Sequence, residues 1–162
     1  MATAPATRPD TDLMMLLSQA SHALACELTA GLADLGVSPR THCVLSKALT
    51  GELTQGRLAE LCALDKTTMV VTIDELERAG LAERRPSSSD RRARIIAVTP
   101  EGERMVAAGQ RIVAGVYEDV LSALPANERK ALVAGLSRLI EDGGRLAAPA
   151  QCERTVRRPR AT

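Results

Sequence analysis

The chain has 162 residues, of which 45% are apolar and 25% are charged, and its formal net charge is +1. This length predicts one domain with a proper core, and the near-neutral charge gives no whole-chain argument for a polyanionic partner. No apolar run approaches the roughly 18 residues that cross a bilayer, and the polar, Pro-rich start lacks the apolar core of a signal peptide, so we expect a cytoplasmic protein.

A long amphipathic helix is expected over residues 12–35. Its apolar residues recur at intervals of three and four, and Gly36 should end it. Ser38 and Pro39 then provide an N-cap and a first-turn proline, so a second helix is expected to continue to about Thr50.

A helix-turn-helix motif is expected over residues 54–79. Thr54 and Gln55 begin a short helix, and Asp65 caps the next helix after only a few residues. Gly80 should close that second helix as a left-handed residue. Helices joined so tightly must cross steeply, which is how a recognition helix is presented to DNA. Leu58, Leu61 and Cys62 share one face of the short helix.

A β-hairpin wing is expected over residues 81–98. Two strand-like segments, 81–85 and 94–98, flank the sequence PSSSDRRA, whose proline, serines and aspartate suit a hairpin loop. Positive charge is concentrated here, because the stretch from Arg84 to Arg94 holds five arginines against one acid. A phosphate backbone could meet that charge.

Two further helices are expected within residues 100–141, after an N-cap at Thr99 and separated at Pro125. Together with the helix over 12–35 they are more apolar than a winged helix of this size could bury, which favours a homodimer interface built from both ends of the chain. The expected fold is therefore mainly α with a small β-wing and about six helices. Its expected divisions are a flexible segment 1–11, a single domain 12–142 and a flexible basic tail 143–162.

The stretch from Leu58 to Met105 resembles the MarR family of winged helix-turn-helix transcriptional regulators. The most specific match is the wing signature Asp, any residue, Arg, five residues, an aliphatic residue and Thr, which here runs from Asp90 to Thr99 with Val98 where Leu is usual. The resemblance covers roughly residues 13–140. It implies a triangular homodimer that acts as a repressor. Its winged helices would bind the two halves of a pseudo-palindromic operator, about one DNA turn apart.

The resemblance and the helical periodicity together indicate which residues contact DNA. On the recognition helix, residues 66, 67, 70, 71 and 74 share one face, and Met69, Ile73 and Leu76 share the other. Asp90 is expected to fix the wing loop by pairing with an arginine, while its neighbours reach the backbone or the minor groove. The expected DNA-binding residues are Thr54, Gln55, Lys66, Thr67, Thr68, Val70, Val71, Asp90, Arg91, Arg92 and Arg94.

Val70 and Val71 stand where members of the family often carry a polar residue and an arginine. Two valines cannot hydrogen-bond to guanine, but they can pack on thymine methyl groups. We therefore expect base readout there to be weaker or more thymine-dependent than is usual. The alternative is a rotated helix in which both valines are simply buried.

The family also implies release from DNA by a small, often anionic or aromatic, ligand that binds between the dimerisation helices and the DNA-reading module. The chain has no Phe or Trp and a single Tyr, Tyr117, so we expect an aliphatic pocket. We predict no cofactor, no metal site and no enzymatic activity. The spacing of His22 and Cys26 would suit two metal ligands, but two ligands do not make a site, and the adjacent His42 and Cys43 point in different directions.

Two alternatives remain open at this point. Some relatives sense oxidants through a cysteine in the first helix, where Cys26 is the candidate, although a small buried cysteine is the default. The four cysteines lack C-x-x-C spacing and are taken as reduced. The other alternative is a helical interaction module whose winged helix binds protein, and strong salt dependence of DNA binding would exclude it.

Overall fold

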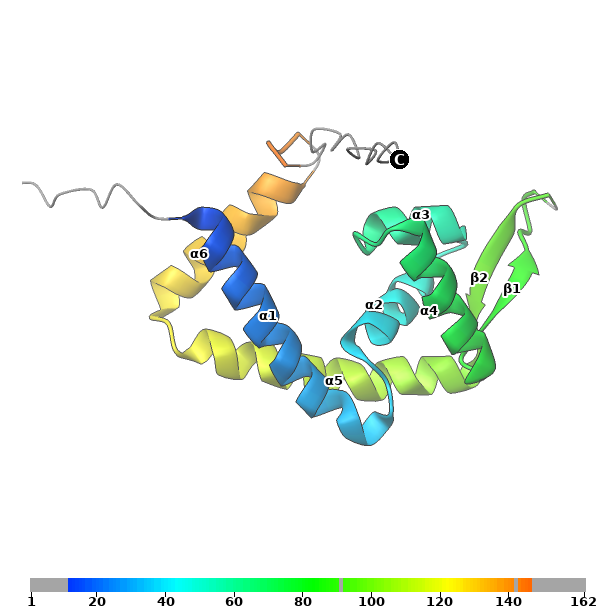
Figure 1. Cartoon of the computed structure of the whole chain (residues 1–162), viewed down its shortest axis with the longest axis horizontal. Helices are drawn as coiled ribbons and strands as arrows, with labels where there is room; N and C mark the ends of the chain where they lie inside the picture. The colour runs from blue at the N-terminus through cyan, green and yellow to red at the C-terminus, as the bar shows by residue number, and fades with distance from the viewer. Residues whose placement is uncertain (1–11, 91, 142, 147–162) are drawn as a thin grey trace, which may run out of the picture. The chain divides into compact units, whose positions relative to one another are not determined.

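The computed structural model describes residues 12–90, 92–141 and 143–146. This part of the chain forms a mainly helical winged-helix fold, as predicted, with six α-helices and a two-stranded antiparallel sheet (Figure 1). The chain divides into two compact units between Val120 and Leu121. None of the described helices is both long and apolar enough to cross a membrane. The predicted segment 1–11 and residues 147–162 of the predicted tail lie outside the described residues.

The elements follow the predicted order, with ends that differ by a few residues. The helices are α1 (Leu13–Leu32), α2 (Pro39–Ala48), α3 (Gln55–Leu61), α4 (Lys66–Arg78), α5 (Pro100–Ser122) and α6 (Ala126–Ile140), and the strands are β1 (Ala82–Pro86) and β2 (Arg94–Val98).

The ends of α1 and α2 are set by local capping signals. The Asp12 carboxylate accepts a hydrogen bond from the Met15 N–H at 3.0 Å and so begins α1. At its other end α1 tightens into a 3₁₀ turn, Ala33–Leu35, before Gly36 takes a left-handed φ of 66°. Ser38 and Thr41 form a reciprocal capping box at the start of α2.

The core of the first unit lies where α2, α3 and α4 meet the hairpin. Leu58, Met69 and Ile73 are completely buried there, and each contributes about 1.5–3 kcal/mol through burial. Gly80, at φ 70°, ends the turn after α4 and lets the chain reverse into β1. The remaining core members are Val44, Leu45, Ala48, Ala59, Leu76, Leu81, Ala82, Ile96 and Val106.

The apolar side chains of α3 are buried to different degrees. Leu58 and Ala59 are buried and Cys62 is half-buried, but Leu61 is 42% exposed. The three and four residues between Leu58, Leu61 and Cys62 place them on one side of the helix, as predicted. Only part of that side faces the core.

The hairpin is joined by a third extended segment that the sequence did not predict. In the β1–β2 register Ala82 pairs with Val98 and Pro86 with Arg94. On the other edge of β2, the Ile96 N–H donates to the Leu53 carbonyl oxygen at 3.0 Å, and Thr54 bridges to Ile95. Thr54 is also the N-cap of α3, so the start of α3 is fixed directly to the wing.

Helix α5 approaches the hairpin and α2 closely because it carries glycines. The Gly102 N–H donates to the Thr99 hydroxyl at 3.1 Å, and a Cβ on Gly102 would overlap the Leu81 carbonyl oxygen. Seven residues further along, Gly109 lies against the ring of His42. A side chain at either position would push the helix away from its neighbour.

The second unit contains α6 and the short segment after it. The Arg129 Nε donates to the Leu124 carbonyl oxygen at 2.8 Å across the turn that begins α6. The Leu146 N–H donates to the Leu139 carbonyl oxygen, also at 2.8 Å. Large apolar side chains remain exposed along α6, namely Leu132, Val133, Leu136, Leu139 and Ile140.

Candidate nucleic-acid interface

One face of α4 is exposed. Val70 is 41% exposed and Val71 is 49% exposed, and Lys66 and Thr67 are exposed on the turn before them. Met69, Ile73 and Leu76 point the other way into the core. The predicted division of the helix into two faces is confirmed, and the alternative in which the valines are buried is wrong.

The first turn of α4 is fixed by Asp65. Its carboxylate accepts hydrogen bonds from the Thr68 N–H at 3.0 Å and from the Thr68 hydroxyl at 2.6 Å. These bonds lower the pKa of the Asp65 carboxyl from its ordinary value, so it stays ionised as the N-cap. Thr68, which we predicted to contact DNA, is half-buried and its hydroxyl is engaged by this cap.

Arg84, on β1, connects the wing to the recognition helix and to α3. Its guanidinium pairs with Asp74 at 2.7 Å, pairs with Glu77, and donates to the Gln55 side-chain oxygen at 3.4 Å. Its main-chain N–H also donates to Glu77 at 2.9 Å. The side chain is 31% exposed and its charge is offset by two carboxylates. We read Arg84 as a group that joins three elements.

The tip of the wing is anchored by Glu52, which lies in the segment before α3. Its carboxylate accepts a hydrogen bond from the Ser87 hydroxyl at 2.6 Å and from the Ser88 N–H at 3.1 Å. The Ser87 and Ser88 hydrogen bonds lower the pKa of the Glu52 carboxyl from its ordinary value. Ser87 is buried by these contacts at 7% exposure, so its hydroxyl holds the loop from inside.

Asp90 and Arg92 shape the rest of the loop. The Asp90 carboxylate accepts a hydrogen bond from the main-chain N–H of Arg92 at 2.9 Å, and its carbonyl accepts one from Ala93. The observed partner of Asp90 is thus a main-chain group, and its pairing with an arginine side chain stays a prediction. The side chains of Arg92 and Arg94 are exposed, while Arg91 lies outside the described residues.

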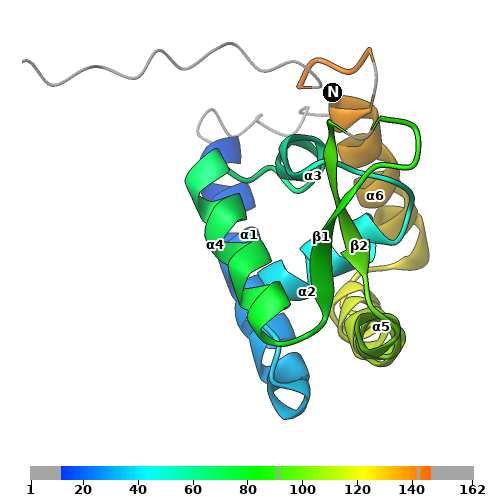
Figure 2. The same cartoon turned by 90° about the vertical axis from the view of Figure 1, so that its right-hand side faces the viewer.

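The start of α3 completes the surface. The Thr54 hydroxyl accepts a hydrogen bond from the Arg57 N–H at 3.3 Å, and Gln55 meets Arg84. Figure 2 shows α4 and the hairpin side by side, with α3 above them. The exposed face of α4, the exposed wing arginines and the start of α3 therefore lie on elements that Arg84 joins to one another. We call it the reading surface.

Two residues that organise the reading surface were missed by the sequence analysis. The sequence indicates Arg84 only as part of a basic cluster and gives no signal for Glu52. The partners of Glu52 are 35 and 36 positions away in the chain, so no local sequence pattern predicts these contacts. For Arg84, the spacing of seven residues from Glu77 becomes a contact only after the chain reverses at Gly80.

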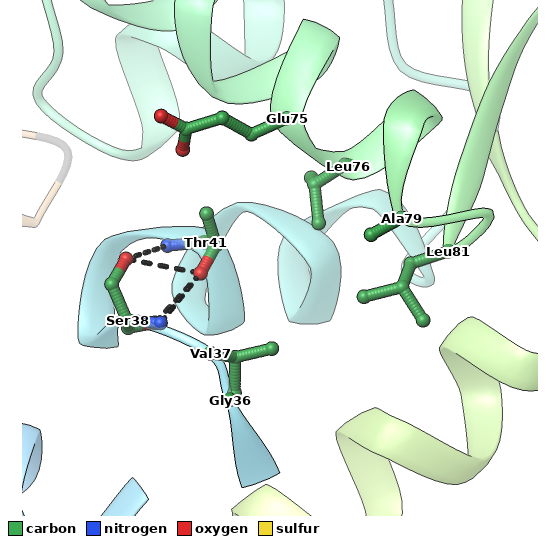
Figure 3. Close-up of a pocket in the computed structure, with 8 residues that line it drawn as sticks. All are labelled: Gly36, Val37, Ser38, Thr41, Glu75, Leu76, Ala79 and Leu81. Atoms are coloured by element: carbon green, nitrogen blue, oxygen red, sulfur yellow. Dashed lines mark hydrogen bonds between the residues drawn. The ribbon is translucent and has the colours of Figure 1, made fainter. Parts of the chain in front are cut away.

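Two cavities lie in the first unit, away from the reading surface. The larger, of about 290 Å³, opens between the start of α2 and the end of α4 (Figure 3). Its polar groups at Ser38 and Thr41 are already engaged with each other in the capping box. Glu75 contributes the one charged side chain among the residues that line it.

The second cavity, of about 210 Å³, lies between α1, α2 and α5. The buried hydroxyl of Ser46 has no hydrogen-bond partner among the described residues. His42 is buried at its edge, with Nε2 3.5 Å from the Val106 carbonyl oxygen. The surface that lines it is mostly apolar, with polar groups from Ser46, Lys47 and Gln110. An aliphatic ligand pocket stays a prediction.

The described cysteines differ in their surroundings. Cys26 is exposed, contrary to the default of a buried residue, and its Sγ lies 3.9 Å from Nε2 of His22. Burial, together with the neighbouring Cys43 thiol, raises the pKa of the Cys62 thiol to about 12. Among the described residues, no three His, Cys, Asp or Glu side chains gather closely enough to hold a metal ion.

Comparison with known proteins points to one class of protein. The sequence pattern of the MarR family matches residues 35–93, which include α2, α3, α4 and the wing loop. A solved transcriptional regulator, PA3341, is 32% identical, with a TM-score of 0.70, and the match covers 78% of this chain and 94% of that chain.

The repressor CouR is similar over a larger part of this chain. CouR from Rhodococcus jostii RHA1, solved with p-coumaroyl-CoA, is 26% identical with a TM-score of 0.74, covering 88% of this chain and 96% of its own. CouR solved on a 23-mer DNA duplex is 27% identical with a TM-score of 0.71, covering 80% of this chain and 92% of its own. These relatives are transcriptional regulators, a class of protein distinct from enzymes.

Proposed function

The chain belongs to the MarR family of transcriptional regulators, and on this premise we propose that it is a homodimeric repressor of a pseudo-palindromic operator, released by a small-molecule ligand. The observation that carries the proposal is the reading surface itself. An exposed helix face is held by Arg84 against a hairpin with exposed arginines. In this arrangement α4 enters the major groove and the wing lies on the adjacent backbone.

Within the reading surface, the proposed contacts divide by chemistry. Lys66 and Thr67 on the first turn of α4, and Thr54 and Gln55 at the start of α3, approach phosphates or base edges. Asp90 shapes the wing loop, which carries Arg92 and Arg94 to the backbone or the minor groove, together with Arg91. Thr68 acts through the cap that it forms with Asp65.

The proposed dimer is supported by apolar surface on the outer helices. In α1 the exposed large apolar residues run without a gap from Leu13 to Leu17, and α6 exposes five more. Patches of this kind on a single chain mark interaction sites, and a second copy covers equivalent faces symmetrically. A dimer also presents two reading surfaces to the two half-sites of a palindrome.

The proposed ligand site is the cavity between α1, α2 and α5. Lys47 is the one charged side chain in its lining, Ser46 offers an unpartnered hydroxyl, and Leu28 and Val113 supply apolar contact. This combination suits a small amphipathic anion. Because the cavity joins α2 of the DNA-reading module to α1 and α5, an occupant that separates these helices changes the spacing of the two reading surfaces in the dimer.

The proposal is tested by titrating the purified protein against its own upstream intergenic DNA by fluorescence anisotropy at several salt concentrations. We expect tight, salt-sensitive binding, and Arg92→Ala should weaken it and lower the salt slope by about one phosphate contact. The same titration is repeated with fragments from the whole genome. If no fragment binds more strongly than random DNA at any salt concentration, the proposed repressor function is rejected and a protein partner for the winged helix is favoured.

A second candidate is release by an oxidant at Cys26. The observation in its favour is that this thiol is exposed and contacts His22 at 3.9 Å. Under this proposal peroxide oxidises the Cys26 thiol to a sulfenic acid, with peroxide reduced to water. Peroxide should then release the wild-type protein from DNA and leave Cys26→Ser bound, and equal release of both proteins would reject this role.

A further inference from the structure

The central turn of the reading surface is apolar. Val70 and Val71 are adjacent, 41% and 49% exposed, and lie between Thr67 and Asp74 on the outward face of α4. Because neither valine is buried, two stiff, branched side chains face outward. Each has one strongly preferred rotamer in a helix. Their methyl groups are therefore presented in fixed positions.

The charged groups beside the valines are already engaged. Asp74 follows them on the same face, and its carboxylate pairs with Arg84 at 2.7 Å. The Arg84 guanidinium also contacts Glu77 and Gln55, so it is not available as the bidentate donor that reads guanine in the major groove. Lys66, a full turn before Val70, can reach phosphates or an outer base from the end of the helix.

From this arrangement, and resting on the proposed function, we propose that Val70 and Val71 read the centre of each operator half-site through the 5-methyl groups of thymines. The Asp74–Arg84 pair supports this readout by removing both a negative charge and a competing guanidinium from that position. A cytosine would present an amino donor and no methyl group to two valines. The half-site should therefore be defined by thymines opposite α4, with no strict guanine there.

The experiment begins by selecting binding sites from random DNA duplexes with the purified full-length protein. Each thymine of the enriched half-site is then replaced, one at a time, by deoxyuridine, which removes only the methyl group. We expect about a fourfold loss of affinity at the positions opposite Val70 and Val71, the equivalent of one buried methyl group. Deoxyuridine in the flanking pairs is the DNA control and should change nothing.

Protein variants connect the methyl effect to the two valines. We call the loss of affinity when one thymine is replaced by deoxyuridine the methyl effect. Val70→Ala and Val71→Ala keep α4 helical because both positions are exposed. In each variant the methyl effect at the matching thymine should disappear, so that thymine and deoxyuridine bind equally well. Lys66→Ala is the contrasting variant. It should weaken binding to all sequences and reduce the salt slope while keeping the methyl effect. Thermal unfolding of each variant checks that the fold is retained.

The outcomes separate this inference from the function on which it rests. The methyl readout is overturned if the enriched sites have strict guanines opposite α4, or if the methyl effect persists in both valine variants. Either result leaves the proposed repressor function intact. Failure to enrich any sequence would overturn both.

Discussion

At the scale of single residues, Arg84 shows that an arginine in a basic wing can be engaged within its own chain. It stands in a stretch with five arginines, yet its guanidinium is directed to Asp74, Glu77 and Gln55 of the same chain. The exposed arginines of the loop, such as Arg92, are the ones available for phosphate. The cluster therefore contains an arginine that joins elements of the fold and exposed arginines, which we propose as the DNA contacts.

Replacing Arg84 should weaken DNA binding without removing a phosphate contact. In Arg84→Ala the wing and α4 lose their shared partner, so we expect affinity to fall about tenfold or more while the salt slope stays unchanged. Arg84→Lys should not restore affinity, because an ammonium cannot bond three partners in a planar fork. Anisotropy titrations over a salt series measure both quantities.

The neighbouring Arg85→Ala is the control, since this exposed side chain pairs with Glu83 on its own strand. A lower salt slope in Arg84→Ala would instead identify Arg84 as a phosphate ligand and contradict the positioning role.

Glu52 gives the wing a pH dependence whose direction follows from its hydrogen bonds. Because folding lowers the pKa of its carboxyl, the contacts with Ser87 and Ser88 are complete above the ordinary glutamate range of about 4.3. They are lost as the pH falls through the lower folded pKa. The Ser88 amide resonance, followed by NMR, should titrate with a midpoint below that range.

Glu52→Gln should abolish this transition, because the substituted side chain does not titrate. It should also make the wing loop more susceptible to trypsin at neutral pH, with little change in thermal stability, since Glu52 itself is exposed and lies outside the hydrophobic core. A midpoint at or above the ordinary range would show that the carboxylate is not held by the loop.

At the scale of elements, the predictable features are those with local signals. The caps at Ser38 and Asp65 and the left-handed Gly80 were recognisable from the sequence, because each acts within four residues of itself. The division of α4 into two faces followed from its helical period. The ends of each element were predicted to within a few residues.

The features that were missed depend on contacts between distant segments. The pairing of Leu53 with Ile96 joins residues 43 positions apart. The extended segment that contains Leu53 and Thr54 is too short to show the alternating pattern that predicts a strand. Leu61 shares a helix side with Leu58 and Cys62 and yet is exposed, so spacing alone does not tell which of the three is buried. The site residues were nominated by helical period and family resemblance, whereas their supports, Arg84 and Glu52, became visible only in the fold.

The glycines of α5 provide a test of packing between elements. Gly102→Ala places a methyl group against the Leu81 carbonyl oxygen, which is already held by the Thr99 N–H. Since neither backbone segment can move alone, we expect a loss of stability of about 1–3 kcal/mol and a lower melting temperature by calorimetry.

Gly115→Ala in the same helix is the matched control. A Cβ at this position meets nothing within 4 Å in the described chain, so the substitution should raise helix stability by about 0.5–1 kcal/mol. Equal effects of the two substitutions would show that helix propensity, rather than contact with the hairpin, governs this helix.

At the scale of the whole molecule, the exposed apolar residues of α1 and α6 predict that the protein is a dimer. Leu16→Glu on α1 or Leu132→Glu on α6 introduces a charge into the proposed interface, so we expect the mass from light scattering to fall to that of one chain. Operator affinity should fall by at least a hundredfold, since the two half-sites then bind independently.

Leu49→Glu is the comparison variant, because Leu49 is a similarly exposed leucine at the end of α2, outside both outer helices. It should leave the dimer intact. If all three variants remain dimeric, the interface lies on other surfaces of the chain.

The aromatic composition of the molecule has an optical consequence. Tyr117 is the sole tyrosine, there is no tryptophan or phenylalanine, and its ring lies at the cavity between α1, α2 and α5. Its intrinsic fluorescence and near-ultraviolet circular dichroism therefore report on one known position, without any label. The protein carries a built-in spectroscopic probe at the place where its ligand is proposed to bind.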